Sequence, residues 1–193
     1  MKKQILLLLF LLFITINISN AANQEDLNKL IKLNKPVTIK GLDLSNTDLR
    51  QYQFNSSKIN LQNANLSHAN LTNVNLEKVN LTHADLSYAN LTNAKLDGAN
   101  LNYANLNHAN LTNAVLTQTN LTNALLQHAL LIGANLQQAN LKKADFTCAN
   151  FNNANLTKAD LIEAIISSAA FTNTITSDIL NYDSVTDNHV NCG

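Results

Sequence analysis

Residues 59–73 read Ile59-Asn60-Leu61-Gln62-Asn63-Ala64-Asn65-Leu66-Ser67-His68-Ala69-Asn70-Leu71-Thr72-Asn73, and the same five-residue unit continues to residue 173. Its third position is Leu, Phe or Ile in 23 consecutive quintets. The first position is usually Ala, and the second is usually Asn or Asp. A helix turns about 100° per residue and a strand alternates every two residues, so neither element matches a strict period of five. A fixed short period is typical of a small unit stacked many times.

Each unit predicts a short extended segment followed by a turn. Its two apolar positions are two residues apart, so both side chains point to the same side of an extended chain. The other residues must change the chain direction before the next unit begins. A chain that turns every five residues and keeps Leu inside is a solenoid. We expect one column of its core to hold Leu61, Leu81, Leu101, Leu121, Leu141 and Leu161.

A second period, of 20 residues, indicates the number of sides. The fifth position of every fourth quintet reads His68, Tyr88, His108, His128 and Cys148. Four quintets per coil would stack these residues in one column along the rod. We therefore expect an all-β solenoid with four sides and about six to seven coils.

Quintets such as Ala69-Asn70-Leu71-Thr72-Asn73 and Ala84-Asp85-Leu86-Ser87-Tyr88 resemble the pentapeptide-repeat family, and the resemblance covers about two thirds of the chain. It implies a right-handed quadrilateral β-helix with the first and third residues of each quintet inside. It also raises one known role of the family, because its quinolone-resistance members protect topoisomerases as DNA mimics.

The pattern divides the chain into four parts. We interpret residues 1–21 as a secretory signal and residues 22–41 as an N-terminal cap made of a short helix and a strand. Residues 42–173 form the repeat region, in which residues 57–58 are two extra residues that shift the register and predict an outward bulge. Residues 174–193 follow the repeats and are expected to cover the last coil.

The N-terminal segment has the three parts of a secretory signal. Lys2 and Lys3 precede an apolar core at residues 5–16, and small residues follow at Ser19 to Ala21. A membrane anchor is the alternative, but this core is short for about 30 Å of hydrocarbon. We expect cleavage, no stable membrane anchor afterwards, and a bacterial protein exported to the periplasm or beyond.

Both ends of the solenoid are expected to be covered, because a bare end exposes unpaired strand groups. Apolar residues at helical spacing between residues 25 and 33, followed by Pro36, predict a short helix at the N-terminal end. At the other end we expect Ile175, Ile179 and Leu180 to lie over the bore.

Charge and shape limit the function classes. The chain has 13 basic and 13 acidic residues, a formal net charge of zero, which gives no electrostatic reason to bind nucleic acid or to imitate it. The expected rod with a filled bore offers no concave site for a catalytic constellation. We therefore expect a protein that is not an enzyme and needs no cofactor.

The column of fifth positions is the one arrangement that suggests metal binding. Imidazole and thiolate groups bind zinc or copper, so His108, His128 and Cys148 are the candidate ligands. A ladder that simply stacks is the favoured alternative, because a linear column seldom supplies converging ligands. Cys148 and Cys192 are the only cysteines, and in an exported protein they either form a disulfide or remain two free thiols.

Four apolar residues stand at outward positions in the middle of the repeats: Val115, Leu125, Leu130 and Ile132. Clustered apolar residues mark interfaces, whereas scattered ones carry no role. We expect Val115, Leu130 and Ile132 to form one patch, with cover by the C-terminal segment as an alternative. The sequence thus predicts an exported scaffold that presents flat faces to a protein partner. A homodimer through one end, a DNA mimic that acts on gyrase and a metal-binding rod are the other hypotheses.

Overall fold

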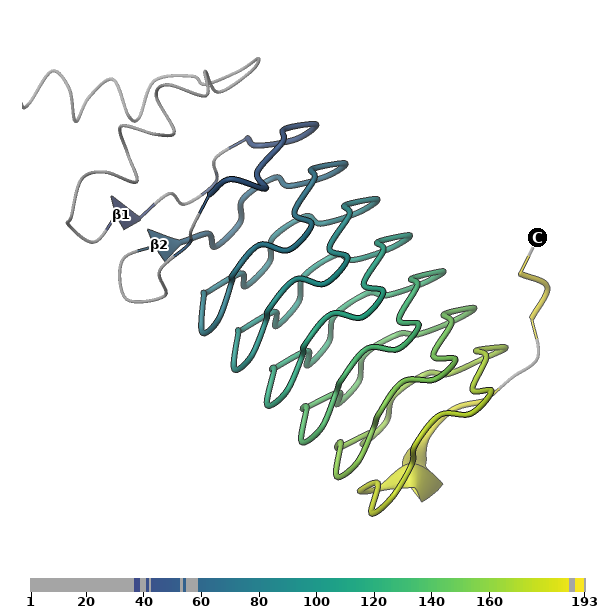
Figure 1. The fold of residues 1–193 in the computed structure, drawn as a ribbon. Helices are drawn as coiled ribbons and strands as arrows, with labels where there is room; N and C mark the ends of the chain where they lie inside the picture. Colours follow the sequence, from purple (N-terminus) through teal and green to yellow (C-terminus); the bar gives the residue numbers. More distant parts are fainter. Residues whose placement is uncertain are drawn as a thin grey trace, which may run out of the picture.

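The chain is a rod of stacked coils, drawn from blue to yellow in Figure 1. The computed structural model describes residues 37–38, 41, 43–52, 54, 59–187 and 190–192. The expected signal, the expected helix between residues 25 and 33 and the two extra residues at 57–58 lie outside these ranges.

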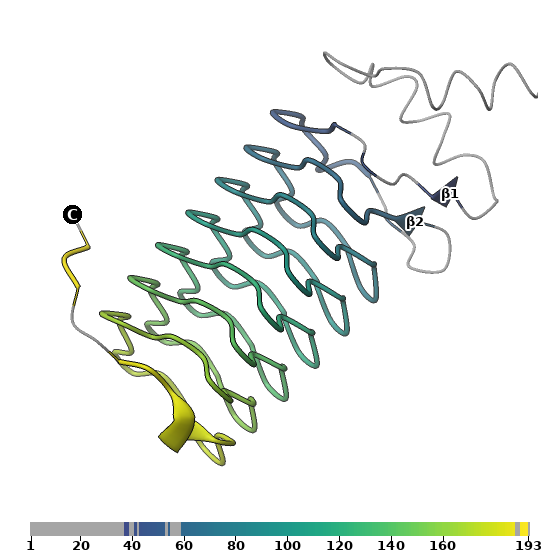
Figure 2. The ribbon, with the colours of Figure 1, turned by 180° about the vertical axis from the view of Figure 1, so that it is seen from behind.

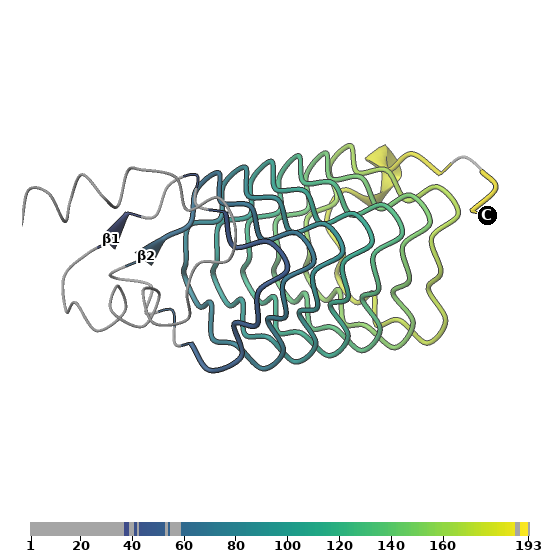
Figure 3. The same ribbon diagram turned by 90° about the horizontal axis from the view of Figure 1, so that it is seen from above.

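Each coil contains four quintets. Second-position residues form parallel bridges with residues 20 positions later, as in Asn80 with Asn100 and Asn100 with Asn120. The coils lie parallel along the rod both from behind (Figure 2) and from above (Figure 3). Most bridges involve one residue per wall. The named strands are β1 (Val37–Thr38) and β2 (Ile59–Asn60).

Three backbone hydrogen bonds per quintet hold one coil to the next. In the middle of the rod, the N–H groups of Leu106 and His108 donate to the carbonyls of Leu125 and Gln127, at 2.6 and 2.9 Å. The N–H of Leu125 donates back to the carbonyl of Ala104 at 3.0 Å. The backbone groups inside the rod are therefore satisfied between coils, as buried peptide groups must be.

The corner of each quintet is a tight turn. The N–H of Ala109 donates to the carbonyl of Leu106 at 3.0 Å, and His108 between them has a φ of 59°. A positive φ at the third residue of a turn is the type II geometry, which favours Gly and Asn and is disfavoured for β-branched residues. This requirement explains why the fifth position is Asn, His or Gly so often and never Val, Ile or Thr between residues 63 and 178.

The second-position Asn helps to form this turn. The Oδ1 atom of Asn110 accepts hydrogen bonds from the N–H of Thr112 at 3.0 Å and from its Oγ1 at 2.6 Å. Asn and Asp side chains form such bonds with the backbone two residues later. The frequent Asn-Leu-Thr triplet is therefore a structural unit of the repeat.

Small and medium apolar side chains fill the bore. Almost all first- and third-position residues between 59 and 166 are buried, and the single buried threonine among them, Thr119, donates its hydroxyl to the carbonyl of Leu96 at 2.8 Å. Phe146 and Phe151 replace Leu near the C-terminal end. The expected core column is buried throughout, at Leu61, Leu81, Leu101, Leu121, Leu141 and Leu161.

The short strand expected within residues 22–41 is β1, so coil pairing begins before the repeat start expected at residue 42. Val37 in β1 pairs in parallel with Ile59 in β2, 22 residues later, and Asp43 bridges Asn65 at the same offset. Later bridges have an offset of 20. This first coil therefore contains two more residues than the others, in agreement with the register shift seen in the sequence.

Coil pairing also continues beyond residue 173, so the expected end of the repeats is corrected. Ile175 bridges Asn155 and Leu180 bridges Asp160, each at the offset of 20. The short 3-10 helix η1 (Tyr182–Ser184) then adds one residue, and Thr186 bridges Ile165. The bonds between coils involve the backbone, so they form without Leu at the third position.

Candidate functional site

The flat walls of the rod are mostly satisfied within the chain. On one wall Asn105 donates its Nδ2 to Oδ1 of Asp85 at 3.1 Å, and on another Asn120 donates to Asn100 at 3.2 Å. The same oxygens also accept backbone N–H groups two residues later. Walls of this kind have few polar groups left for a partner, so recognition is expected where the repeat is interrupted.

The predicted interface residues interrupt three different walls. Leu125 and Leu130 are 43% and 40% exposed and lie on adjoining walls of one coil, where the repeat usually has Asn. Val115 is half-buried and lies one coil earlier, on the wall that comes next after the wall of Leu130. Ile132 is half-buried at the corner directly after Leu130. The wall of Leu130 separates Leu125 from Val115, so the four residues do not share one flat face.

The fifth-position column is an aromatic ladder. The ring centroids of His68 and Tyr88 are 4.9 Å apart, those of Tyr88 and His108 are 4.6 Å apart, and those of His108 and His128 are 4.8 Å apart. The planes are parallel to within 7°. A second stack joins His83 and Tyr103 at 4.9 Å on the preceding corner. Stacked faces at this separation contribute packing energy along the corner.

The ladder ends in a disulfide. The sulfur atoms of Cys148 and Cys192 are 2.06 Å apart, and their Cα atoms are 5.6 Å apart. Next to the bond, the Ser168 hydroxyl donates to the carbonyl of Val190 and accepts its N–H, at 2.9 and 2.8 Å. The last described residues therefore lie along a corner of the rod, one coil back from its end.

This disulfide removes the predicted metal site. Its bond occupies the Cys148 sulfur, and the stacked rings of His108 and His128 do not converge on a common point. Among the described residues, no group of three His, Cys, Asp or Glu side chains is placed to hold a metal ion.

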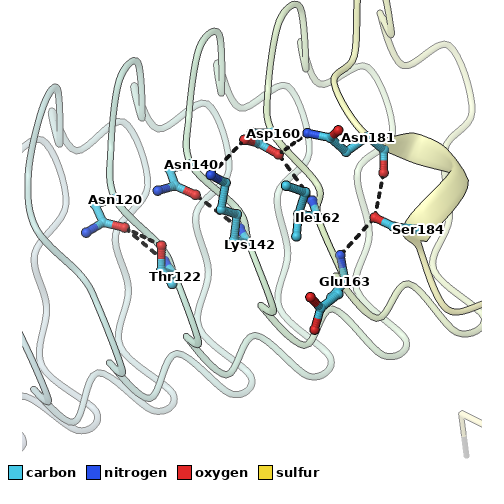
Figure 4. A network of polar contacts seen from close by, with 9 residues as sticks. All are labelled: Asn120, Thr122, Asn140, Lys142, Asp160, Ile162, Glu163, Asn181 and Ser184. Carbon is cyan, nitrogen blue, oxygen red and sulfur yellow. Dashed lines mark hydrogen bonds and ion pairs between the residues drawn. The ribbon is translucent and has the colours of Figure 1, made fainter.

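A polar network joins η1 to the last two coils (Figure 4). Asp160 accepts hydrogen bonds from Nδ2 of Asn181 at 2.8 Å and from the N–H of Ile162 at 3.2 Å, and Nζ of Lys142 lies 3.2 Å away. Partial burial raises the pKa of the Asp160 carboxyl, but these donors outweigh it and lower the pKa below its ordinary value.

Ser184 replaces a backbone acceptor in the same network. Its hydroxyl accepts the N–H of Glu163 at 3.0 Å and donates to the carbonyl of Asn181 at 2.8 Å. In earlier coils the equivalent N–H donates to a carbonyl of the next coil. The side chain thus completes a coil that the extra residue of η1 would otherwise interrupt.

The C-terminal end of the bore is an open cavity of about 540 Å³, whereas the sequence predicts that residues 174–193 cover it. Ile175 and Leu180 do not lie over it, because they occupy second positions on the outer walls and are 50% and 49% exposed. Ile179 alone of the three predicted residues lines the cavity. The other lining residues are Phe151, Leu156, Leu161, Ile166, Phe171, Thr176, Asp178 and Tyr182.

A smaller recess of about 340 Å³ lies at another corner. Gly98 has no side chain to continue the column between Lys78 and Gln118, and Asp97 and Thr117 line the same recess. Sequence reasoning did not single out either recess. The sequence feature that marks the smaller recess is a glycine in a column of long side chains. The feature that marks the end cavity is the polar residue Thr176 at a third position.

No helix in the described part of the chain combines the length and the apolar character needed to cross a membrane. A search of curated proteins found no significant match. Among solved structures, a pentapeptide repeat protein from Nostoc PCC 7120 is 33% identical, covers 64% of this chain and 84% of its own, and has a TM-score of 0.23. One from the Arabidopsis thaliana thylakoid lumen is 29% identical, covering 52% of this chain and 66% of its own, with a TM-score of 0.34.

A third solved structure is QnrB1, described as a plasmid-mediated fluoroquinolone resistance protein. It is 14% identical, covers 76% of this chain and 91% of its own, and has a TM-score of 0.35. The family model of pentapeptide repeats matches residues 59–98 and 149–175, and the model of the pentapeptide repeat region matches residues 84–161. Known structures of such proteins are right-handed quadrilateral β-helices. The two models together match residues 59–175, which is more than half of the chain, so the chain belongs to the pentapeptide repeat family.

Proposed function

We propose that this protein is a non-enzymatic, exported interaction scaffold of about six to seven coils, whose rigid rod presents a few interrupted positions to a protein partner. The observation that carries the proposal is the contrast between the walls. Most second positions hold Asn or Asp side chains engaged within the rod, whereas Leu125 and Leu130 are exposed on adjoining walls of one coil.

The disulfide supports the exported location. Bonds of this kind persist in oxidising compartments such as the periplasm and are rare in reducing ones. Cys148 and Cys192 are already paired in the folded chain, and the N-terminal residues have the composition of a secretory signal. Export predicts that residues 1–21 are removed and that thiol reagents do not label the purified protein until it is reduced.

The experiment uses variants that restore the usual residue of the repeat. Leu125→Asn and Leu130→Asn should leave the melting temperature nearly unchanged, because Asn is the common residue at the second position. Chemical cross-linking to proteins of the exported compartment should then lose its specific adduct. Lys95→Asn, on a different wall, is the matched control and should retain the adduct. The proposal fails if the double variant cross-links as well as the natural chain does.

The gyrase hypothesis predicts a different result. A DNA mimic needs an acidic surface and access to cytoplasmic gyrase, and this chain has a formal net charge of zero. The purified, oxidised protein should leave gyrase supercoiling and its inhibition by a quinolone unchanged at micromolar concentration. Protection of gyrase in that assay would favour the DNA-mimic role instead.

A further inference from the structure

We propose that the open C-terminal end of the bore is a docking site for an extended peptide segment of a partner protein, with one apolar anchor flanked by Lys or Arg. This inference rests on the proposed scaffold function and assigns the partner a chemistry and a second place of contact. Three observations at this end support the inference: the cavity, the unpaired backbone edge of the last coil and the acidic charge.

The cavity has the shape and lining of an anchor pocket. Four apolar third-position residues of the preceding coil, one from each wall, form its floor: Phe151, Leu156, Leu161 and Ile166. In the last coil, only Phe171 continues this apolar layer, and its ring stacks on Phe151 at 5.0 Å. A volume of about 540 Å³ lies in the range of sites that bury a ligand side chain.

The last coil leaves the bore open because its sequence departs from the repeat. The residues that follow its other three bridges are Thr176, Asn181 and Asp187, where earlier coils have Leu, Phe or Ile. Asn181 points to Asp160 in the wall network, and Asp187 is exposed. Residues 190–192 do not cover the cavity, because the bonds to Ser168 and Cys148 hold them along a corner.

The edge of the last coil presents backbone donors to an added strand. In the coil before it, the N–H groups of Leu156 and Lys158 donate forward to the carbonyls of Ile175 and Ser177, at 2.8 and 3.0 Å. The equivalent N–H groups of Thr176 and Asp178 meet no further coil within the described residues. An open edge of this kind binds extended peptides by strand addition, in which alternate side chains enter pockets.

Charge selects the occupant. From residue 159 to the end the sequence has five acidic residues and neither Lys nor Arg. Asp160 and Glu163 form salt bridges with Lys142 and Lys143 of the coil before, at 3.2 and 3.4 Å, which leaves Asp178, Asp183 and Asp187 as the acidic charge of the end. Asp178 lines the cavity mouth itself. A second copy docked through the same end would bring these like charges together, whereas a segment with Lys or Arg beside its anchor would complement them. We therefore assign the site to a basic, extended segment of another protein.

The probes are three capped heptapeptides titrated into the full, oxidised chain and followed by amide NMR shifts. The first has a central leucine flanked by threonines and lysines. The second replaces lysine with glutamate, and the third replaces leucine with serine. We expect the first peptide to bind and to shift the amide signals of Thr176 and Asp178. The glutamate and serine peptides should bind about tenfold more weakly or not at all.

Two variants test the site without removing core residues. Thr176→Leu restores the usual third-position residue and fills the cavity, so it should reduce affinity about tenfold or more without lowering the melting temperature. Asp178→Asn keeps a residue that tolerates the positive φ of 54° and should weaken binding about two- to fivefold. Asp85→Asn, at the middle of the rod, changes the same charge and should leave binding unchanged.

Three outcomes would overturn the inference. One is equal binding of the lysine and glutamate peptides, and another is unchanged binding in Thr176→Leu. The third is a dimer in sedimentation experiments that dissociates in Thr176→Leu, because it would make a second copy the occupant. None of these results bears on the adduct that depends on Leu125 and Leu130, so failure of the end site is distinguishable from failure of the scaffold function.

Discussion

Replacement of Leu106 by Ala should destabilise the rod strongly. Leu106 is fully buried at a third position in the middle of the chain. The change removes three carbon groups, which at about 0.8 kcal/mol each corresponds to about 2.4 kcal/mol of lost transfer energy. A cavity term adds to this, because the backbone bond from Leu106 to Leu125, at 2.6 Å, fixes the spacing of the coils and limits collapse. The expected total is about 3–5 kcal/mol.

Urea denaturation followed by circular dichroism measures this loss, with Leu125→Ala as the matched control. Leu125 is a leucine of the same region, but its side chain is 43% exposed on a wall. Its truncation should cost less than about 1 kcal/mol. Equal losses in the two variants would refute the assignment of third positions to the bore. Stacked repeats can unfold in parts. The two free energies of unfolding are therefore comparable only if both variants have the same m-value, which is the slope of the unfolding free energy against urea concentration.

Three further predictions concern the disulfide, a corner and the C-terminal network. Cys192→Ser should lower the free energy of unfolding by about 2–4 kcal/mol, because the bond to Cys148 closes a loop with a sequence separation of 44. Reduction of the natural chain should give the same melting temperature as the variant. A larger drop in melting temperature on reduction would contradict this. Asn107→Ala should cost about 1 kcal/mol in chemical denaturation, because its Oδ1 accepts the N–H of Gln127 at 2.8 Å; a neutral result would mean that water replaces this bond. The lowered pKa of Asp160 means that its carboxylate stabilises the fold above the ordinary pKa of 3.8, and that this contribution is lost as the pH falls through the lowered value. The melting temperature of Asp160→Asn should therefore change less between pH 7 and pH 2 than that of the natural chain. An identical pH dependence of the two proteins would exclude that role.

The period of the sequence predicts the middle of the rod well, because burial there follows directly from position. Leu106 and Ala109 are inside for the same reason in every coil. The period does not predict the role of Asn107, because a polar residue at an outward position is expected to contact only water. The structure shows that it is half-buried and accepts a backbone bond from the next coil, which no pattern within a single quintet reveals.

The C-terminal end was predicted less well for a physical reason. The pattern of Leu, Phe or Ile at the third position ends at Phe171, and the next third position is Thr176. Coil pairing, however, depends on backbone bonds and on turns with positive φ, which Asp178 and Asn181 also adopt. The side-chain pattern therefore indicates where the bore is filled, and the backbone determines where the coils stop. The open cavity lies between these two limits.

The disulfide also has a mechanical consequence for the rod. If the chain is pulled by its C-terminus, tension passes from Cys192 through the sulfur atoms to Cys148. The intervening segment, with a sequence separation of 44, carries no load while the bond is intact. Reduction would release a contour length of about 150 Å, at roughly 3.3–3.6 Å per residue. While the bond is intact, a force applied to the C-terminal residues therefore does not unfold the acidic, open end of the rod.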